Sequence, residues 1–303
     1  MINKKKNHKN TNGRRILLLS ILCLFGFCLV AQVRPQRNAA QPAKSKVYLL
    51  HSDVLKKSKD NSDAQILVGD VSFRHDSIYM YCDSACFYEK TNSLEAFHNV
   101  KFVQGDTLFL YGDYLFYDGN TQLAQVRNNV RMENRTTTLT TDSLNYDRIA
   151  NLGYFFDGGT LMDEENVLTS DWGEYSPATK MSVFNYEVKL VNPQFTLTSD
   201  TLRYNTDTKI ASIVGPSDID SDENHIYSEL GFYYTQQGQA ELLERSVLTN
   251  NGKRMTGDSL FYDRNRGIGE AFRNVELVDT INKNMLTGEY CFYNQLTGYA
   301  FAT

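Results

Sequence analysis

An acidic residue recurs through the chain at a nearly constant spacing, and carboxylates in such a series could do two kinds of chemistry. Stacked carboxylates could bind a cation such as Ca²⁺, which prefers several oxygen ligands. Two carboxylates about 5–10 Å apart could hydrolyse a glycosidic bond. The acids follow Asp53 at gaps of 29 to 31 residues and are Asp83, Asp113, Asp142, Asp171, Asp200, Glu229, Asp258 and Glu289.

The distribution of these acids favours neither chemistry. They are spread evenly along the chain, whereas a glycosidase site adds its carboxylates locally, in one cleft. The calcium-binding nonapeptide repeat has a denser, glycine-rich spacing. One acid at one fixed position per repeat is typical of a residue that caps a bend, with its carboxylate accepting backbone N–H groups. We therefore expect structural acids and predict no catalytic residue, no metal and no cofactor.

The other reactive residue types lead to the same expectation. The five histidines are scattered, and the sequence shows neither an obvious Ser-His-Asp arrangement nor a Gly-rich phosphate loop. Cys82, Cys86 and Cys291 are an odd set outside the N-terminal segment, so we interpret them as packing residues. A β-helical carbohydrate-active enzyme is the catalytic alternative.

Each acid belongs to a longer repeat. An aromatic residue stands four positions after each of the eight acids, as in Asp113–Tyr117 and Asp258–Tyr262, and a small residue stands just before each acid. A second landmark, a polar step followed by Val, a polar residue and an apolar one, lies about halfway between acids, as in residues 98–102. Internal repeats of this kind determine a whole fold.

The residues around both landmarks alternate between apolar and polar, which is typical of strands. Phe109 and Tyr111 are expected on the same face as Leu115 and Tyr117, and the small residue before the acid fits a bend or bulge. Turn residues such as those at 118–121 follow each aromatic. We therefore predict an all-β, elongated, twisted antiparallel β-jellyroll of roughly 29-residue, two-strand repeats. A parallel β-helix with one coil per repeat is the alternative.

The apolar and aromatic columns of the repeat are the remaining candidate site. They could fill a closed core between two sheets, or line an apolar groove if the sheets do not close completely, because both need the same inward face. The groove candidates are Leu115, Tyr117, Val130, Leu144, Tyr146, Tyr175, Leu202, Tyr204, Tyr233, Leu260 and Tyr262.

The chain divides into an N-terminal segment, a linker and the repeat array. Residues 1–31 combine a basic stretch with an uncharged apolar run of 15 residues, which suits a signal peptide and is short for a membrane span, although an N-terminal anchor is the alternative. Residues 32–46 are a polar linker, and residues 47–303 form one repeat domain. We expect an exported protein.

The net charge of −5 is unevenly placed. Residues 1–31 hold six basic residues and no acid, so the remainder carries 25 basic against 36 acidic residues, a net charge of −11. A body this acidic repels phosphate backbones, which makes nucleic acid an unfavourable partner.

An exported array of Asp-Ser-Leu-x-Tyr and Asn-Val-x-Leu/Phe units resembles the LptA/OstA family, the organic-solvent-tolerance proteins of Gram-negative lipopolysaccharide export. The units that carry the resemblance include Gly257–Tyr262, Phe272–Leu277 and Thr141–Tyr146. The resemblance covers about residues 47–303. Because each motif is short, its specificity comes from repetition after an export signal.

This resemblance implies a semi-open antiparallel jellyroll in the periplasm, possessing a groove that shields lipopolysaccharide acyl chains. It implies lipopolysaccharide as ligand and other transport proteins as partners, joined end to end by β-strand pairing, with possible outer-membrane association or anchoring. The final residues 298–303 stop before a returning strand is complete, which suggests a partial chain or an open edge strand. A structural or adhesive scaffold with a closed core and no ligand is the alternative function.

Overall fold

Alternating apolar residues and frequent turn signals make nearly the whole repeat region β-strand. The structure, a computed structural model, describes residues 45–58, 63–221, 224–244 and 246–303. These residues contain 23 strands and no helix. Every pairing between these strands is antiparallel. The predicted all-β antiparallel fold is confirmed, and the parallel β-helix is wrong, because neighbouring strands are joined by hairpins.

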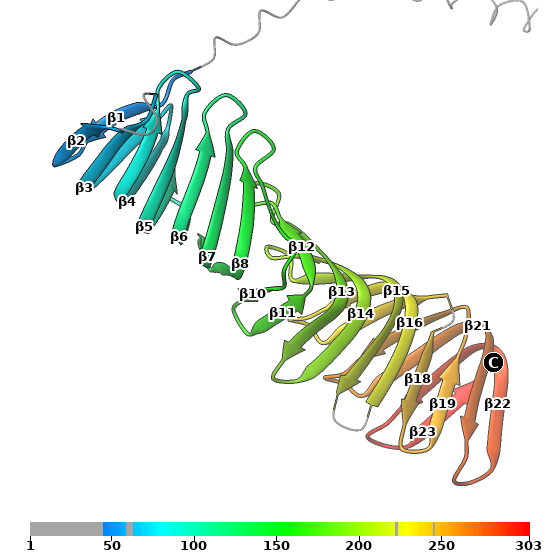
Figure 1. The fold of residues 1–303 in the computed structure, drawn as a ribbon. Coiled ribbons are helices and arrows are strands. Elements are labelled where there is room, and N and C mark those ends of the chain that lie inside the picture. Colours follow the sequence, from blue (N-terminus) through cyan, green and yellow to red (C-terminus); the bar gives the residue numbers. More distant parts are fainter. Residues whose placement is uncertain (1–44, 59–62, 222–223, 245) are drawn as a thin grey trace, which may run out of the picture. The chain divides into compact units, whose positions relative to one another are not determined.

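The repeat consists of an outgoing strand that carries the acid and a returning strand that carries the Val landmark (Figure 1). In some repeats the strand is interrupted where it bends. The outgoing strands are β1 (Tyr48–His51) with β2 (Val54–Lys57), β4 (Ile78–Tyr88), β6 (Leu108–Asp118), β8 (Thr137–Asp147), β11 (Asn166–Ser170) with β12 (Trp172–Tyr175), β14 (Phe195–Asn205), β16 (Asn224–Tyr234), β19 (Lys253–Thr256) with β20 (Ser259–Asp263), and β22 (Asn284–Asn294).

Each returning strand except β23 pairs with the outgoing strands before and after it, so the repeats stack along one continuous ladder, and β23 pairs with β22. The returning strands are β3 (Gln65–His75), β5 (Ser93–Gln104), β7 (Leu123–Asn134), β9 (Leu152–Phe155) with β10 (Gly159–Asp163), β13 (Met181–Asn192), β15 (Ile210–Ser221), β17 (Gln239–Leu243) with β18 (Val247–Asn250), β21 (Ile268–Asp279) and β23 (Tyr299–Ala302).

Every full-length strand bends near its middle, and we call this bend the corner. On the returning strand two residues with positive φ, such as His98 and Asn99, face a single residue of the neighbouring strand, which is a β-bulge. The small residue before the acid is needed for close packing there, since a Cβ on Gly112 would lie 2.4 Å from Val126 Cγ1. The corner gives each strand two halves, which we call arms.

The corner also changes which residues face inward. In β6, Leu108 and Leu110 are buried before the corner and Leu115 and Tyr117 after it, whereas Phe109 lies on the outer face. The expectation that Phe109 and Tyr111 share a face with Tyr117 is therefore wrong. The strict two-residue alternation slips by one position where the strand bends around the bulge of its neighbour.

The two arms differ in the turns that end them. One arm, the short-turn arm, ends in tight turns such as Asn134–Thr137, and the other, the long-turn arm, ends in longer turns such as Asn205–Ile210. Along the long-turn arm, successive turns are bonded to one another, as in Thr235 N–H to the Lys209 carbonyl at 3.1 Å. The residue whose carbonyl accepts this bond has positive φ. This holds for Lys209 and for Gly238, whose carbonyl accepts from Arg264 N–H.

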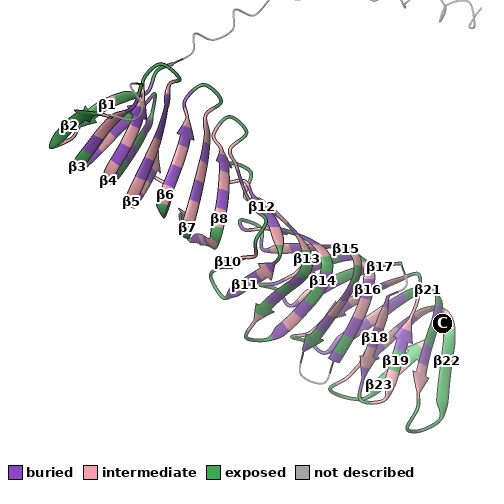
Figure 2. Cartoon of the chain, viewed as in Figure 1, coloured by how far each residue is buried: buried purple, intermediate pink, exposed green. Residues whose placement is uncertain are grey.

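The two arms face each other across a single hydrophobic core that runs through residues 47–302 (Figure 2). Aromatic rings from opposite arms meet there, with ring centroids 5.4 Å apart for Phe73 and Phe87 and 4.5 Å apart for Phe195 and Tyr233. Residues 45–303 form one compact unit. The predicted segment 1–31 and nearly all of the linker 32–46 lie outside the described residues.

Candidate functional site

The groove candidates all lie in the interior between the two arms. Ten belong to the long-turn arm and one, Val130, to the short-turn arm. Each exposes 3% of its surface or less: Leu115, Tyr117, Val130, Leu144, Tyr146, Tyr175, Leu202, Tyr204, Tyr233, Leu260 and Tyr262. In this structure their side chains contact the opposite arm and fill the interior.

The opposite wall of the interior was largely missed from the sequence. It is built from the short-turn arm, where Phe73, Phe102 and Leu110 are buried. Phe102 contacts two tyrosines of the other wall, with ring centroids 6.2 Å from Tyr117 and 6.0 Å from Tyr146. The signal that could have identified this wall is the apolar residue two positions after the landmark Val, as in Val100 and Phe102.

Where the arm tips meet, a row of polar side chains closes the interior, and we call this row the seam. The short-turn tip contributes one polar residue per repeat, including His75, Gln104, Asn134, Asp163 and Asn250, at spacings of 29 or 30 residues between neighbouring repeats. The long-turn tip contributes the hydroxyl of the tyrosine that stands four positions after the repeat acid. The measured contacts are Tyr117 Oη to His75 Nδ1 at 2.7 Å, Tyr146 Oη to Gln104 Oε1 at 3.4 Å, Tyr175 Oη to Asn134 Oδ1 at 3.1 Å, Tyr204 Oη to Asp163 Oδ2 at 2.9 Å, and Tyr293 Oη to Asn250 Oδ1 at 3.1 Å.

The seam tyrosines are protonated near neutral pH, and burial raises their pKa further. It raises the pKa of Tyr146 and of Tyr233 to about 12, and it raises the pKa of Tyr117 further. The pKa of Tyr204 is raised first by burial and then by the negative charge of Asp163. These hydroxyls can therefore donate to the acceptors on the opposite arm.

A buried ion pair lies in the seam between Asp163 and Lys209. The Lys209 ammonium lies 2.7 Å from Asp163 Oδ1 and 2.8 Å from Oδ2, and the two side chains are 6% and 0% exposed. Asn166 donates to the Tyr204 hydroxyl at 3.0 Å and to Thr235 Oγ1 at 3.2 Å. Two opposite charges and three hydrogen-bonding partners thus meet where the arms close.

Two repeats earlier, the equivalent positions are neutral. Gln104 Nε2 donates to Asn151 Oδ1 at 3.0 Å, and the Tyr146 hydroxyl donates to the same Asn151 oxygen at 3.1 Å. Asn151 and Lys209 both precede a returning strand and both have positive φ. The same backbone framework therefore holds an ionic contact in one repeat and an amide contact in another.

A buried histidine occupies the first described seam position. The His75 imidazole contacts the Ser45 hydroxyl and the Tyr117 hydroxyl, and its side chain is fully buried. Burial lowers the pKa of His75, while the nearby Asp76 carboxylate opposes that shift. Arg148 reaches Asp76 at 3.1 Å from the long-turn arm and lowers the pKa of that carboxyl, whose partial burial acts in the opposite direction.

The repeat acids lie at the corners, away from the seam. Seven of the eight are exposed, and Glu229 is half-buried. At three of them a side-chain amide of the neighbouring bulge donates to the carboxylate, a partner different from the expected backbone N–H groups. Side-chain amides donate to the carboxylates from Asn99 to Asp83 at 2.8 Å, from Asn129 to Asp113 at 2.6 Å, and from Asn274 to Asp258 at 3.0 Å.

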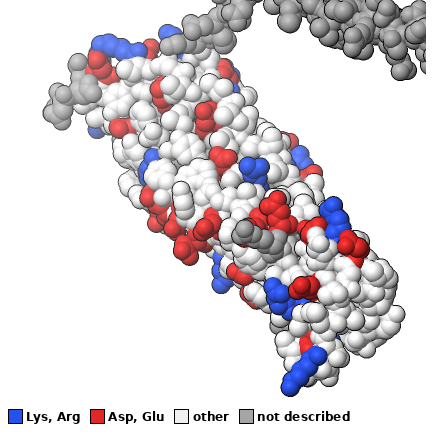
Figure 3. All heavy atoms as spheres, turned by 90° about the vertical axis from the view of Figure 1, so that its right-hand side faces the viewer, with Lys and Arg blue, Asp and Glu red and all other residues white. Residues whose placement is uncertain are grey.

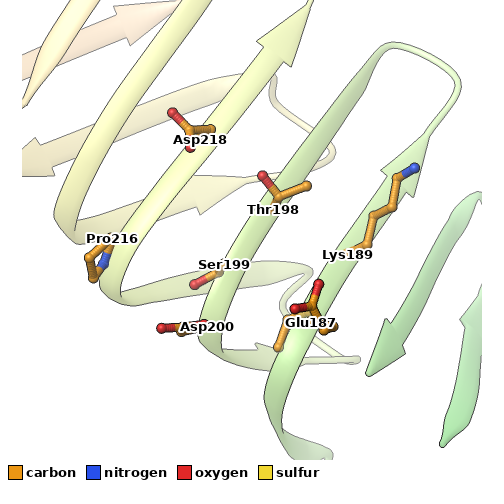
Figure 4. Close-up of a pocket in the computed structure, with 8 residues that line it drawn as sticks. Glu187, Lys189, Thr198, Ser199, Asp200, Pro216 and Asp218 are labelled. Atoms are coloured by element: carbon orange, nitrogen blue, oxygen red, sulfur yellow. The ribbon is translucent and has the colours of Figure 1, made fainter. Parts of the chain in front are cut away.

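One corner carries a small polar hollow. It measures about 370 Å³ and is bordered by side chains of β13, β14 and β15 (Figure 4). The Ser199 hydroxyl beside it donates to the Thr201 carbonyl at 2.9 Å and so caps the corner. Among the described residues, three or more His, Cys, Asp or Glu side chains nowhere gather as a metal site would require.

The surface charge and the cysteines agree with a structural role for these groups. On the face shown in Figure 3, acidic and basic side chains are intermingled among wide uncharged areas. The three cysteines of the described residues carry free thiols. Burial raises the pKa of Cys82 to about 12 and that of Cys291 to about 11, so both thiols are poor nucleophiles.

At the last repeat the apolar wall borders an open cleft. A cleft of about 620 Å³ lies there, with Leu277, Met285 and Ala300 among its lining residues and the Lys253–Asp279 ion pair at 3.4 Å beside them. Met285 is 62% exposed. The same apolar wall that is filled elsewhere is therefore accessible at this repeat.

A family model described as OstA-like protein matches residues 44–200 and 218–302. The chain belongs to the OstA-like family. None of the curated proteins searched matches this OstA-like chain.

Among solved structures, the OstA-like chain is similar to LptH, described as the LptA homologous periplasmic component of the conserved lipopolysaccharide transport device from Pseudomonas aeruginosa. The two are 17% identical, with a TM-score of 0.36, and the match covers 39% of this chain and 98% of LptH. In the described part of the OstA-like chain, no helix is long and apolar enough to cross a membrane.

Proposed function

We propose that this protein is a periplasmic carrier in lipopolysaccharide transport and that its two arms shield the acyl chains of the lipid. The observation that supports this most is the single apolar interior, which runs unbroken through the repeats between two facing walls. Membership of the OstA-like family supports the same role. The protein acts by binding, and the energy for transport comes from other components.

An acyl chain bound between the arms is stabilised by its removal from water. Each CH₂ group buried contributes about 0.8 kcal/mol. Because residues such as Leu144 and Leu202 already fill the interior, the lipid must replace contacts between the walls. The arms therefore part along the seam when an acyl chain enters, and the acyl chain takes over the contacts that the walls lose.

The acidity of the protein is compatible with this lipid. Phosphate groups on the lipid headgroup would be repelled by a body with a net charge of −11, given by 25 basic and 36 acidic residues beyond residue 31. The headgroup therefore stays in water, where cations can screen it, and only the acyl chains enter. Burial, rather than charge attraction, supplies the affinity.

Partners and location follow from the same proposal. The first half of β22 pairs with β21 only, since β23 covers residues 291–294, and β1 and β2 expose Leu50 and Leu55. Such edges can pair with a strand of another transport protein. Residues 1–31 act as an export signal or an anchor, so that the repeat domain works in the periplasm.

Photocrosslinking tests this function directly. A photoreactive residue at Leu144 or Leu202, both inside the interior, is expected to crosslink lipopolysaccharide in the purified full-length protein. The same residue at Arg203, which is adjacent to Leu202 and exposed, serves as the matched control. Crosslinking at all three positions alike, or at none while the protein is folded, would argue against the proposal.

The filled core also supports a second function, that of a structural scaffold without a ligand. A scaffold with no ligand needs the complete burial seen at Tyr175 and Tyr204. Such a scaffold predicts that no interior position crosslinks lipid, and that depletion of the protein leaves the composition of the outer membrane unchanged.

A further inference from the structure

The two arms are joined at the seam through side chains. In the described residues, the backbone ladders pair successive strands of the array, and none crosses from a short-turn tip to a long-turn tip. The contacts that hold the tips together are hydrogen bonds and ion pairs such as those of Tyr117, Tyr146 and Lys209. The arms can therefore separate without breaking the sheet.

The seam positions differ in what they gain from water when the tips separate. A neutral amide or hydroxyl exchanges one hydrogen bond for another, so its closed state keeps a modest net advantage. A buried ion pair is different, because both ions lost their hydration when the protein folded, and their mutual attraction repays that loss only in part. When such a pair separates into water, it regains the hydration of both charges.

Asp163 and Lys209 are the pair to which this argument applies. Both side chains are buried, they come from opposite arms, and the ammonium contacts both carboxylate oxygens. Glu164, which is exposed beside the pair, lies 3.4 Å from the same ammonium and offers it a partner at the surface. Tyr204 shares the Asp163 carboxylate and can bond to water equally well once the tips separate.

We infer that the seam is a lateral gate and that it opens first at Asp163 and Lys209. The direct contact between the two ions holds the tips together at this point. Because separation rehydrates both charges, opening costs less free energy here than at a neutral position of the seam. The neutral contact of Gln104, Asn151 and Tyr146 stays closed under the same conditions. As a route for acyl chains this gate rests on the proposed function, whereas the opening itself is a property of the protein alone.

Electron-paramagnetic-resonance distance measurements on the lipid-free, full-length protein test the inference. Spin labels are attached through unnatural amino acids at Glu165 and Thr208, two exposed residues beside the ion pair on opposite arms. The control pair is Asp106 and Ala150, which are exposed and hold the equivalent positions beside Gln104 and Asn151. We expect a longer second distance at the first pair and a single short distance at the control pair.

The decisive variant replaces the ions by apolar side chains, Asp163→Leu with Lys209→Met. This double variant is expected to lower the population of the long distance by roughly tenfold, because separation no longer hydrates two charges. Methionine suits the position, since Lys209 already has positive φ and an unbranched side chain. The matched variant Gln104→Leu is expected to leave both distance distributions unchanged.

A charge-swapped variant, Asp163→Lys with Lys209→Asp, keeps the inference testable if the apolar variant fails to fold. It retains two buried ions, so the longer distance is expected to persist. A long-distance population that is equal or larger in the apolar variant would overturn the inference, because the ion pair would then be a lock. So would a short distance alone at Glu165 and Thr208 in the unmodified protein.

These outcomes are separate from those of the proposed function. If the gate opens as expected but Leu144 and Leu202 crosslink no lipopolysaccharide, the lipid role fails and the gate stands. If both positions crosslink the lipid while the distances beside Asp163 never change, the carrier role stands and the gate is wrong.

Discussion

Two repeats of this protein differ in the contact that closes the seam, which is neutral in one and ionic in the other. Gln104, Asn151 and Tyr146 form a neutral contact, whereas Asp163, Lys209 and Tyr204 form an ionic contact in the same backbone positions. The long turns beside them, residues 148–151 and 206–209, have the same length, but β5 and β6 at Gln104 are continuous whereas the strands that meet at Asp163 are interrupted at the corner. The comparison teaches that the repeat supplies a closed interior, and that the seam residue in each repeat determines how readily that interior opens.

Removing one ion should produce the largest difference between these two repeats. Asp163→Asn leaves the Lys209 ammonium buried beside a neutral amide, which is expected to lower the free energy of unfolding by about 3–5 kcal/mol. Gln104→Ala at the equivalent neutral position is expected to cost only about 1 kcal/mol for its lost hydrogen bond. Urea unfolding followed by tryptophan fluorescence and circular dichroism measures both, and equal losses would remove the distinction between the repeats.

Removing both ions should have the opposite sign. Asp163→Leu with Lys209→Met is expected to leave the free energy of unfolding unchanged or to raise it by about 1–4 kcal/mol, because two desolvated charges are replaced by packed apolar groups. The same urea titrations measure this change. A loss as large as that of Asp163→Asn would mean that the pair contributes net stability to the closed seam.

The neutral repeat can be probed by removing one hydroxyl. Tyr146→Phe keeps the ring against Phe102 but removes the hydrogen bond to Asn151, so we expect a loss of about 0.5–1.5 kcal/mol. Tyr204→Phe should cost more, since that hydroxyl donates to a carboxylate. Thermal and urea unfolding of the two variants side by side would show whether the order holds, and the reverse order would contradict it.

The smallest effect is expected at His75, where the seam is sensitive to pH. Burial lowers the pKa of His75 below 6.5, so the unfolded chain binds more protons than the folded one as the pH falls through 6.5. Stability is therefore expected to be fully present above this range and to decrease as the pH falls toward the folded-state pKa. Urea midpoints at pH 7.5 and 5.5 measure it, with His75→Gln as control; a pH dependence that the control retains in full belongs to other groups.

The repeat, the two strands per unit and the antiparallel pairing could all be predicted from the sequence. An acid followed by an aromatic residue recurs about every 29 residues, and such a recurrence indicates a backbone that repeats with the same period. The small residue before each acid likewise indicated the corner, where Gly112 meets Val126. The side chain that bonds to each acid could not be predicted from the repeat. Asn99 and Asn129 reach the carboxylates only because a bulge turns their backbone to positive φ.

The seam was beyond sequence reasoning for a different reason. Its partners are separated by 41 to 47 residues, as in Asp163–Tyr204 and Gln104–Asn151, so they belong to different repeats brought together by the inclination of the two arms. Sequence patterns identify a column of equivalent residues in successive repeats, such as Tyr146 in β8 and Tyr204 in β14, but not which column faces it. The polar residue at a short-turn tip, such as Asn134 or Asp163, is of a type that is common in turns, so its residue type does not indicate a partner on the other arm.

The measurement that tests the account most directly is the distance between spin labels at Glu165 and Thr208 with and without lipopolysaccharide. If acyl chains enter between the arms at the ion pair, the longer distance should become dominant when the lipid is added, while the labels at Asp106 and Ala150 follow only as the lipid occupies the earlier repeats. Bound lipopolysaccharide with an unchanged, short distance at Glu165 and Thr208 would contradict the account.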